Sequence, residues 1–365
     1  MADTHGMCDE RFGAVRETLA ASLDDRDVGA SVAVYLDGEP VVDLWGGYAD
    51  AERTVPWERD TIVNVWSTTK TMTALCALIL ADRGDLDLTA PVAKYWPEFA
   101  AAGKERVEVR HLLSHTAGLP AFDEPITVEQ VCDREESTRR LAGQFPRWEP
   151  GTQAGYHAVT QGHLVGEVVR RVTGRTLGAF FAEEVAGPLG ADFHIGTPAE
   201  HDHRVASVIA PPPSPGDSGE PGNPPLRAED ANTVAWRRAE IPAGNGHGNA
   251  RAVGAVQSVL SNGGTARGVR LLSPAGCERA LEEQYHGPDR VLGVPMRYGI
   301  GYGLGGGMFP GRRTCYWGGW GGSLVVNDLD ARMTVAYAMN RMLSGSLGDD
   351  RGLLLVTAAY ESLPA

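Results

Sequence analysis

β-Strand patterns lie near both ends of this 365-residue chain, and a long helical stretch separates them. Early in the chain, two β-rich runs at 31–36 and 40–45 flank Asp37-Gly38, a pair that favours a β-hairpin turn. Further β-like runs follow late in the chain, at 298–304, 322–327 and 333–339. We therefore expect an α/β fold in which both ends of the chain contribute strands to one antiparallel sheet.

Helical patterns border these strands. Segment 10–22 has apolar residues at helical spacing, and a second helix is expected to begin near Ser67 and to stop at Gly84. Two more helices are expected late in the chain, at 252–261 and 352–361. Helices at these places would flank the sheet.

The middle of the chain shows a different sequence pattern, in which helical segments alternate with Pro- and Gly-rich connectors. We expect residues 88–245 to form an all-helical insertion domain. Residues 1–87 and 246–365 would then be the two parts of the α/β domain. The longest connector, 211–225, holds seven prolines, so it is expected to be a surface loop or a mobile flap.

Composition excludes several classes of protein. The formal net charge of 33 − 47 = −14 disfavours nucleic acid as a partner, because phosphate repels such a surface. No run approaches the roughly 20 apolar residues of a membrane span, and the first residues do not form a secretory signal. The five cysteines are odd in number and widely spaced, which favours a reducing cytoplasm over a disulfide framework.

No metal or cofactor is expected. The glycine run 301–306 matches a dinucleotide-binding pattern by letter, but it does not open a helix. The histidines around 202 and 247 lack a clear third ligand for a metal ion.

Ser67-Thr68-Thr69-Lys70 is the sharpest chemical feature, in a chain with only three lysines. Residues three apart share one face of a helix, so the hydroxyl of Ser67 and the amine of Lys70 can meet. A serine needs a base to act as a nucleophile, and a desolvated lysine can supply one. The alternative is an ordinary capping serine followed by a solvated lysine.

Two further segments carry groups that such a serine would need. Tyr156 lies in a turn-rich loop, 148–158, that leads into a helix, where a second proton-transfer group could sit. The glycine-rich run 317–322 opens an apolar strand. Closely spaced glycines let a ligand approach the backbone, as the edge of an oxyanion hole requires.

Together these motifs resemble the class C β-lactamase-like serine hydrolases, above all their esterase branch, the family VIII carboxylesterases. Segments 109–119 and 327–330 are also similar, and the resemblance extends from about residue 10 to the C-terminus. It implies a β-lactamase/penicillin-binding-protein-like fold, an antiparallel sheet flanked by helices with an all-helical insertion. The active site would lie between the two parts.

The resemblance also implies roles for individual residues. Ser67 matches the acylated nucleophile and Lys70 its partner. Tyr156 matches the catalytic tyrosine, with Lys70 favouring its phenolate. The backbone N–H groups of Ser67 and Trp320 would form the oxyanion hole.

Five residues are candidates for substrate binding. Trp317, Gly318 and Gly319 match the third motif of the family, and His157 follows the tyrosine directly. His247 lies where the chain returns from the helical insertion, and for it a plain loop is as good an interpretation as the rim of the active site.

Departures from the β-lactamase pattern point to ester chemistry. Class C β-lactamases carry Asn two places after the tyrosine and Lys-Thr-Gly as the third motif, whereas this chain has Ala158 and Trp317-Gly318-Gly319. The motifs thus predict a hydrolase of small-molecule carboxylic esters. Acyl transfer to an alcohol or amine in natural-product biosynthesis is the main alternative. β-Lactamase or D-amino-acid peptidase activity and a non-catalytic acyl sensor are weaker ones.

Overall fold

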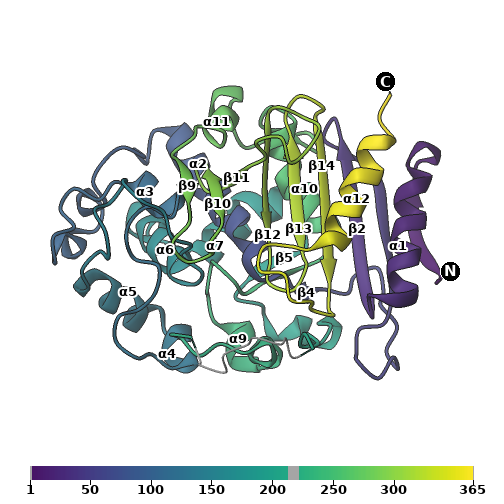
Figure 1. The fold of residues 1–365 in the computed structure, drawn as a ribbon, viewed down its shortest axis with the longest axis horizontal. Coiled ribbons are helices and arrows are strands. Elements are labelled where there is room, and N and C mark those ends of the chain that lie inside the picture. Colours follow the sequence, from purple (N-terminus) through teal and green to yellow (C-terminus); the bar gives the residue numbers. More distant parts are fainter. Residues whose placement is uncertain (1, 213–221, 365) are drawn as a thin grey trace.

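A nine-stranded antiparallel sheet forms the centre of the protein, whose computed structural model describes residues 2–212 and 222–364 (Figure 1). In spatial order the strands are β1 (Thr4–Cys8), β3 (Glu39–Gly47), β2 (Gly29–Leu36), β14 (Met333–Met339), β13 (Leu324–Asp328), β12 (Thr314–Gly318), β11 (Gly303–Leu304), β10 (Pro295–Tyr298) and β9 (Tyr285–Pro288). Strand β2 pairs directly with β14. The expectation that both ends of the chain share one antiparallel sheet is therefore confirmed.

The turn between β2 and β3 has the predicted hairpin geometry. Asp37 and Gly38 have φ angles of 54° and 82°. Two successive residues with positive φ make the turn whose twist matches that of the strands it joins. The Asp-Gly pair in the sequence thus marks a turn that needs two successive residues with positive φ.

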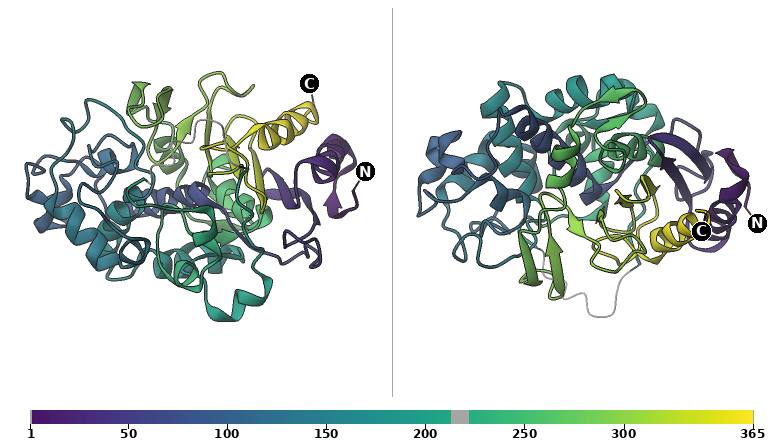
Figure 2. Two further views of the ribbon diagram at one scale, coloured as in Figure 1. Left: turned by 60° about the horizontal axis from the view of Figure 1, so that its bottom comes forward. Right: turned by 90° about the horizontal axis from the view of Figure 1, so that it is seen from above.

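Helices cover both faces of the sheet. On one face, α10 (Ala250–Ser261) packs so closely that a Cβ on Gly254 would lie 2.7 Å from the ring of Tyr35. Tyr337 and its partner Val32 point to the other face, where α1 (Gly13–Asp25) and α12 (Asp350–Glu361) lie side by side. Figure 2 shows that the two ends of the chain meet at this side of the molecule.

Shorter elements make up the rest of the chain. The remaining helices of the α type are α2 (Thr69–Arg83), α3 (Val109–Leu113), α4 (Val128–Cys132), α5 (Arg134–Gly143), α6 (Thr160–Thr173), α7 (Leu177–Phe181), α8 (Gly187–Leu189), α9 (Val234–Arg238) and α11 (Pro274–Arg279). Short 3-10 helices lie at η1 (Glu10–Phe12), η2 (Trp66–Thr68), η3 (Val92–Lys94), η4 (Pro97–Ala100), η6 (Ala199–Arg204) and η7 (Ala228–Asn232), and η5 (Ala182–Ala186) is a short π-helix. Two small sheets are formed by β4 (Val63–Asn64), β6 (Gly246–Gly248) and β5 (Phe193–Ile195), and by β7 (Thr265–Ala266) and β8 (Val269–Arg270).

Helix α2 runs through the middle of the molecule. All its residues from Thr69 to Ala81 are buried, and it ends at Gly84, whose φ of 83° is the left-handed cap expected from the sequence. A helix that is buried all round must be covered on every side. Here α6 and α7 cover it from the helical part, and α10 and α11 from the part that contains the sheet.

Run 298–304 differs from the expectation of a single β-like segment. The chain reverses within it, so that Tyr298 at the end of β10 pairs with Gly303 at the start of β11. Gly301, with a φ of 81°, makes the turn, and a Cβ there would lie 2.3 Å from the side chain of Ala74 in α2. The close approach to the central helix therefore requires glycine at the turn.

The expectations for the connector 211–225 and for the domain boundaries are not tested by the structure. Most of the connector 211–225, namely residues 213–221, lies outside the described residues. The boundaries between the two proposed domains stay predictions.

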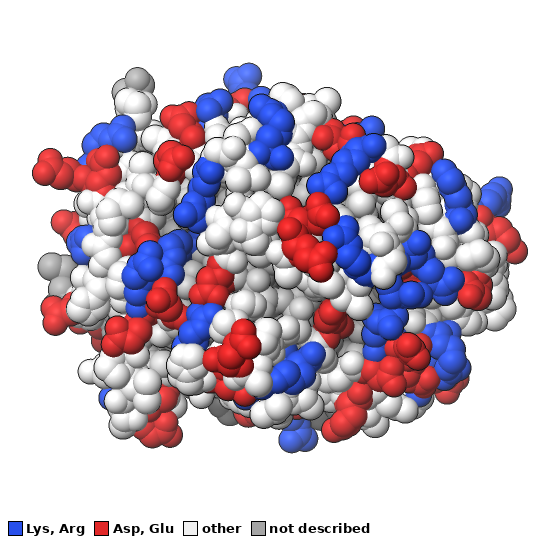
Figure 3. Space-filling model, turned by 180° about the vertical axis from the view of Figure 1, so that it is seen from behind, with Lys and Arg blue, Asp and Glu red and all other residues white. Residues whose placement is uncertain are grey.

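No helix among the described residues combines the length and the apolar character needed to cross a lipid bilayer. On the face seen in Figure 3, acidic and basic side chains are interspersed despite the net charge of −14.

A buried ion pair links the first and last helices to the sheet. The side chains of Asp27 and Arg351 are both fully buried, and Nη1 of Arg351 lies 2.7 Å from Oδ1 of Asp27. Tyr337 donates a hydrogen bond of 2.8 Å to the same carboxylate. Nη2 of Arg351 donates to the carbonyl of Gly321 at 2.6 Å and pairs with Asp349. The arginine therefore connects α12 to the segment that follows β12.

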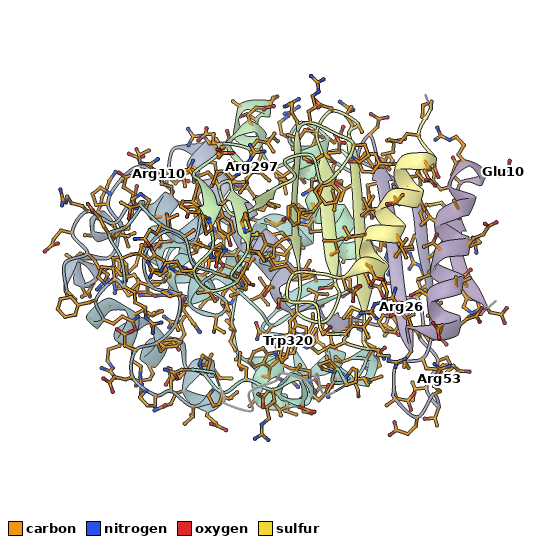
Figure 4. All side chains as sticks on the ribbon, in the orientation of Figure 1. Glu10, Arg26, Arg53, Arg110, Arg297 and Trp320 are labelled. Atoms are coloured by element: carbon orange, nitrogen blue, oxygen red, sulfur yellow. The ribbon has the colours of Figure 1, made fainter. Side chains whose placement is uncertain are left out.

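Replacement of Asp27 by alanine should lower the free energy of unfolding by about 3 kcal/mol, because it leaves a buried guanidinium with Asp349 as its remaining carboxylate. Urea unfolding measures this loss. The matched control is Asp350→Ala, since Asp350 is 65% exposed and pairs with Arg26 on the surface (Figure 4). That variant should lose less than about 1 kcal/mol. Equal losses in the two variants would contradict the assigned role of the buried pair.

Candidate active site

Ser67 lies in the single-turn helix η2, directly before α2. The preceding residue, Trp66, has a φ of 48°, a left-handed conformation that L-residues rarely adopt and that is concentrated at functional sites. Ser323 holds this turn in place, because its hydroxyl donates to the carbonyl of Val65 at 2.7 Å and lies 2.9 Å from the hydroxyl of Thr68. The strained turn is thus tied to the start of β13.

Lys70 reaches the serine from the first turn of α2. Its Nζ lies 3.1 Å from Oγ of Ser67, 2.7 Å from the carbonyl oxygen of Ala158 and 2.9 Å from that of Ala243. The residue is only 1% exposed, and burial lowers the pKa of its amine well below the ordinary value. A capping serine followed by a solvated lysine is therefore excluded. The amine is placed to be neutral and to accept a proton.

Tyr156 also contacts Ser67. Its hydroxyl donates a hydrogen bond of 2.5 Å to Oγ of Ser67. Burial raises the pKa of this phenol above its ordinary value. The expectation that Lys70 favours the phenolate of Tyr156 stays a prediction, and burial of both groups opposes it because burial disfavours both charged forms. Among the described residues, Nζ of Lys70 makes no hydrogen bond to the phenol and lies instead 4.8 Å from the centre of its ring.

Aromatic rings pack behind Tyr156. The ring of Trp317 lies 5.7 Å from that of Tyr156 and is stacked on that of His115 at 5.3 Å. His115 also lies 5.1 Å from both Tyr156 and Tyr298. Trp317 is 1% exposed, so it supports the tyrosine from behind. It does not line the pocket described below, contrary to the expectation of substrate contact.

Neither of the two candidate histidines, His157 and His247, lines the pocket described below. Nε2 of His157 accepts from the backbone N–H of Leu119 at 3.0 Å, so its Nδ1 is the nitrogen that donates to the carbonyl of Gly155 at 2.6 Å. His247 in β6 is fully buried, with Nδ1 2.9 Å from the carbonyl of Asn245. Burial lowers the pKa of His157 to about 4 and that of His247 to about 3. Both side chains are therefore buried with pKa values that favour the neutral form, and their expected contact with substrate stays a prediction.

Gly318 and Gly319 allow close packing of the backbone. A Cβ on Gly319 would lie 2.2 Å from Oγ of Ser323 and 2.4 Å from the carbonyl oxygen of Val65. A Cβ on Gly318 would lie 2.2 Å from the backbone of Leu347. The glycine spacing in the sequence predicts that a ligand approaches the backbone here. In the structure these glycines let the end of β12 lie against the turn that carries the nucleophile.

The expected oxyanion groups face the same space. Ser67 and Trp320 both line the pocket beside the nucleophile. Among the described residues, neither backbone N–H group donates a hydrogen bond to another part of the chain. Trp320 lies at the ends of the central strands, next to the helical part (Figure 4). Free N–H groups at this place suit an oxyanion hole, and the assignment stays a prediction.

An apolar pocket of about 350 Å³ opens over Ser67. None of the described residues that line it is charged. Its walls are formed by Trp66, Ser67, Tyr156, Ala158, Val159, Leu226, Trp236, Ile241, Gly244, Val291, Leu292, Trp320 and Ser346. Most of these wall residues were missed in the sequence, because they come from separate loops and carry no motif of their own.

The chain is similar to several known proteins. A family model described as Beta-lactamase matches residues 15–359. A Mycobacterium tuberculosis protein described as esterase/beta-lactamase LipL is 36% identical over 376 residues, which cover 93% of this chain and 83% of that protein. A solved family VIII carboxylesterase is 44% identical, with a TM-score of 0.94 over 99% of this chain and 100% of that one. A penicillin-binding protein homologue from Caulobacter crescentus is 38% identical, with a TM-score of 0.93 at the same coverage.

Replacement of Gly319 by alanine should reduce kcat by about 10²-fold, the effect of losing one oxyanion-hole donor, because the new methyl group must displace Val65 or Ser323. Steady-state kinetics and circular dichroism measure the effect on rate and on folding. Gly143→Ala is the control. It lies at the end of α5, and a Cβ there would meet nothing within 4 Å. A folded Gly319→Ala variant with normal kcat would show that this packing does not position the site.

Proposed function

The chain belongs to the beta-lactamase family, and on that premise we propose that it is a serine hydrolase that cleaves carboxylic esters of small molecules. The observation that carries the proposal is the convergence of Lys70 and Tyr156 on Oγ of Ser67 at the floor of an apolar pocket. The names of the similar proteins, one an esterase/beta-lactamase and one a family VIII carboxylesterase, support it.

Acylation begins with proton transfer from Ser67 to Lys70. A neutral amine donates its two N–H groups to the carbonyls of Ala158 and Ala243, which leaves its lone pair for the hydroxyl proton of the serine. Oγ bonds to the ester carbonyl carbon as the proton moves to Nζ. The N–H groups of Ser67 and Trp320 are the donors proposed for the resulting oxyanion.

Tyr156 then protonates the leaving alcohol. Its hydroxyl already lies 2.5 Å from Oγ, so its proton is close to the oxygen that departs. Collapse of the tetrahedral intermediate breaks the bond from the carbonyl carbon to the alcohol oxygen. The phenolate that forms is transient: the proton that Nζ took from Ser67 returns to it, and because Nζ makes no direct hydrogen bond to the phenol, this transfer runs through a bridging water. Water repeats these steps on the acyl-enzyme and restores the Ser67 hydroxyl.

The pocket favours uncharged substrates. Its described walls offer no cation for the carboxylate of a penicillin or cephalosporin, and the strong charge-assisted hydrogen bond of such a group is therefore lacking. Acyl transfer to an alcohol or amine would use the same acyl-enzyme, and an added nucleophile tests for it. We also propose a reducing, cytoplasmic location, which the five free cysteines support.

Incubation with a short-chain aryl ester should add one acyl group to the wild-type protein, seen by intact mass spectrometry. Ser67→Ala should show no adduct and a turnover at least ~10³-fold lower, because the nucleophile is lost. A penicillin should acylate the wild type far more slowly than the ester. Alcohol added to the reaction should yield a new ester only if acyl transfer competes with water. The proposed nucleophile would be wrong if the alanine variant kept a tenth of the activity.

The pH dependence of kcat/KM follows from the two pKa shifts. The reaction needs neutral Lys70, whose pKa is lowered, so kcat/KM should fall only as the pH drops through that lowered value. It also needs protonated Tyr156, whose pKa is raised, so the plateau should extend beyond the ordinary tyrosine pKa of about 10. Initial rates across this range test both limbs. An alkaline limb below pH 9 would contradict the role of Tyr156, and an acid limb near the ordinary lysine value of 10.5 would contradict that of Lys70.

A further inference from the structure

A buried aspartate closes the loop that forms one wall of the pocket. Asp289 follows β9 and is 1% exposed. Its Oδ1 accepts hydrogen bonds of 2.8 Å from the backbone N–H groups of Val291 and Leu292. Its Oδ2 accepts one of 2.7 Å from the hydroxyl of Tyr298. Both Val291 and Leu292 line the pocket over the nucleophile.

The same local device occurs a second time, away from the pocket. Asp328, at the end of β13, is also 1% exposed. Its Oδ1 accepts hydrogen bonds of 2.9 Å from the N–H groups of Asp330 and Ala331, and its Oδ2 accepts one of 2.7 Å from the hydroxyl of Tyr360. None of these four residues lines the pocket. An aspartate and a tyrosine can therefore close a turn in this protein without any connection to the pocket.

Asp289 has one contact that Asp328 lacks. Its Oδ1 also accepts a hydrogen bond of 3.1 Å from the backbone N–H of Tyr156. The residue after Asp289 is also joined to the loop that carries Tyr156, because the backbone N–H of Arg290 donates to the carbonyl of Ala154 at 2.9 Å. The ring of Tyr298, which donates to Asp289, belongs to the aromatic group behind Tyr156. One carboxylate thus holds both the proton donor and the wall of the pocket.

We propose that Asp289 is a positioning residue that sets Tyr156 and the Val291–Leu292 wall as one unit. Reaction rate and selectivity for the size of the substrate then depend on the same carboxylate. The inference rests on the proposed ester hydrolysis, since it assigns a role within that reaction. Hydrogen bonds to a buried carboxylate are strong, and displacement of a reacting group by about 1 Å can cost ~10²-fold in rate.

The test compares alanine and asparagine variants at the two aspartates. Asp289→Ala and Asp328→Ala should both lower the midpoint of urea unfolding, because each removes a buried acceptor. Activity is measured on p-nitrophenyl acetate and p-nitrophenyl hexanoate. The concentration of active sites is measured by titration with a p-nitrophenyl phosphonate, which releases one p-nitrophenol per site. Rates are divided by this concentration, so a loss of folded protein does not lower kcat.

Asp289→Ala should lower kcat per active site by about 10–100-fold, in line with displacement of a reacting group, and should change the acetate-to-hexanoate ratio of kcat/KM by more than about threefold. Asp328→Ala should leave both quantities within about twofold of the wild type. Asp289→Asn keeps an oxygen for the three N–H groups, so it should recover most of the kcat lost in the alanine variant. A purely structural role would lower the number of active sites and leave the ratio unchanged.

Two results would overturn the proposal: an unchanged ratio and kcat per site in Asp289→Ala, or equal changes in the two alanine variants. If Asp289→Ala does not fold, Tyr298→Phe takes its place. This variant removes only one donor to Asp289, and Tyr360→Phe is its control. Tyr298→Phe should shift the ratio, and Tyr360→Phe should not. Failure of the proposed function is seen separately, as a wild type without ester turnover or a Ser67→Ala variant that retains it.

Discussion

The desolvated amine of Lys70 is the group on which the site depends. An unpaired ammonium at this depth would be costly, and the structure meets that cost by keeping the amine in contact with Ser67 and two backbone carbonyls. Ala158 belongs to the loop after Tyr156, and Ala243 to the segment before β6. Because Lys70 itself belongs to α2, three separate segments of the chain meet around one nitrogen atom.

Close backbone packing surrounds the turn that carries Ser67. Gly319 lets the end of β12 touch the nucleophile turn, and the left-handed Trp66 lets that turn point Ser67 into the pocket. Arg351 binds the carbonyl of Gly321 from the opposite side. Each of these contacts is short and would be lost with a small shift of the backbone. Chemistry at Ser67 thus relies on parts of the chain that never touch a substrate.

Local signals in the sequence are sufficient for strands β2, β3, β13 and β14, for the family and for the residues around Ser67. The Asp37-Gly38 turn, the Gly84 cap and the spacing from Ser67 to Lys70 each act within a few residues, so a single sequence carries them. The wall of the pocket and Asp289 depend on contacts between distant segments. Trp317 and His157 matched a motif, yet tertiary packing directed their side chains away from the pocket.

The pairing of the first strands with the last has a consequence for synthesis of the protein. Asp27 leaves the ribosome long before Arg351, its partner 324 residues later, and β2 must wait for β14 to gain its neighbour. Contacts of such long range form slowly, and unpaired strand edges are prone to aggregation while they wait. The nascent chain therefore holds Ser67, Lys70 and Tyr156 for most of translation without an assembled active site. Because Arg351 lies in α12, the contacts that tie the segment after β12 to Asp27 can form only after the last helix has been made.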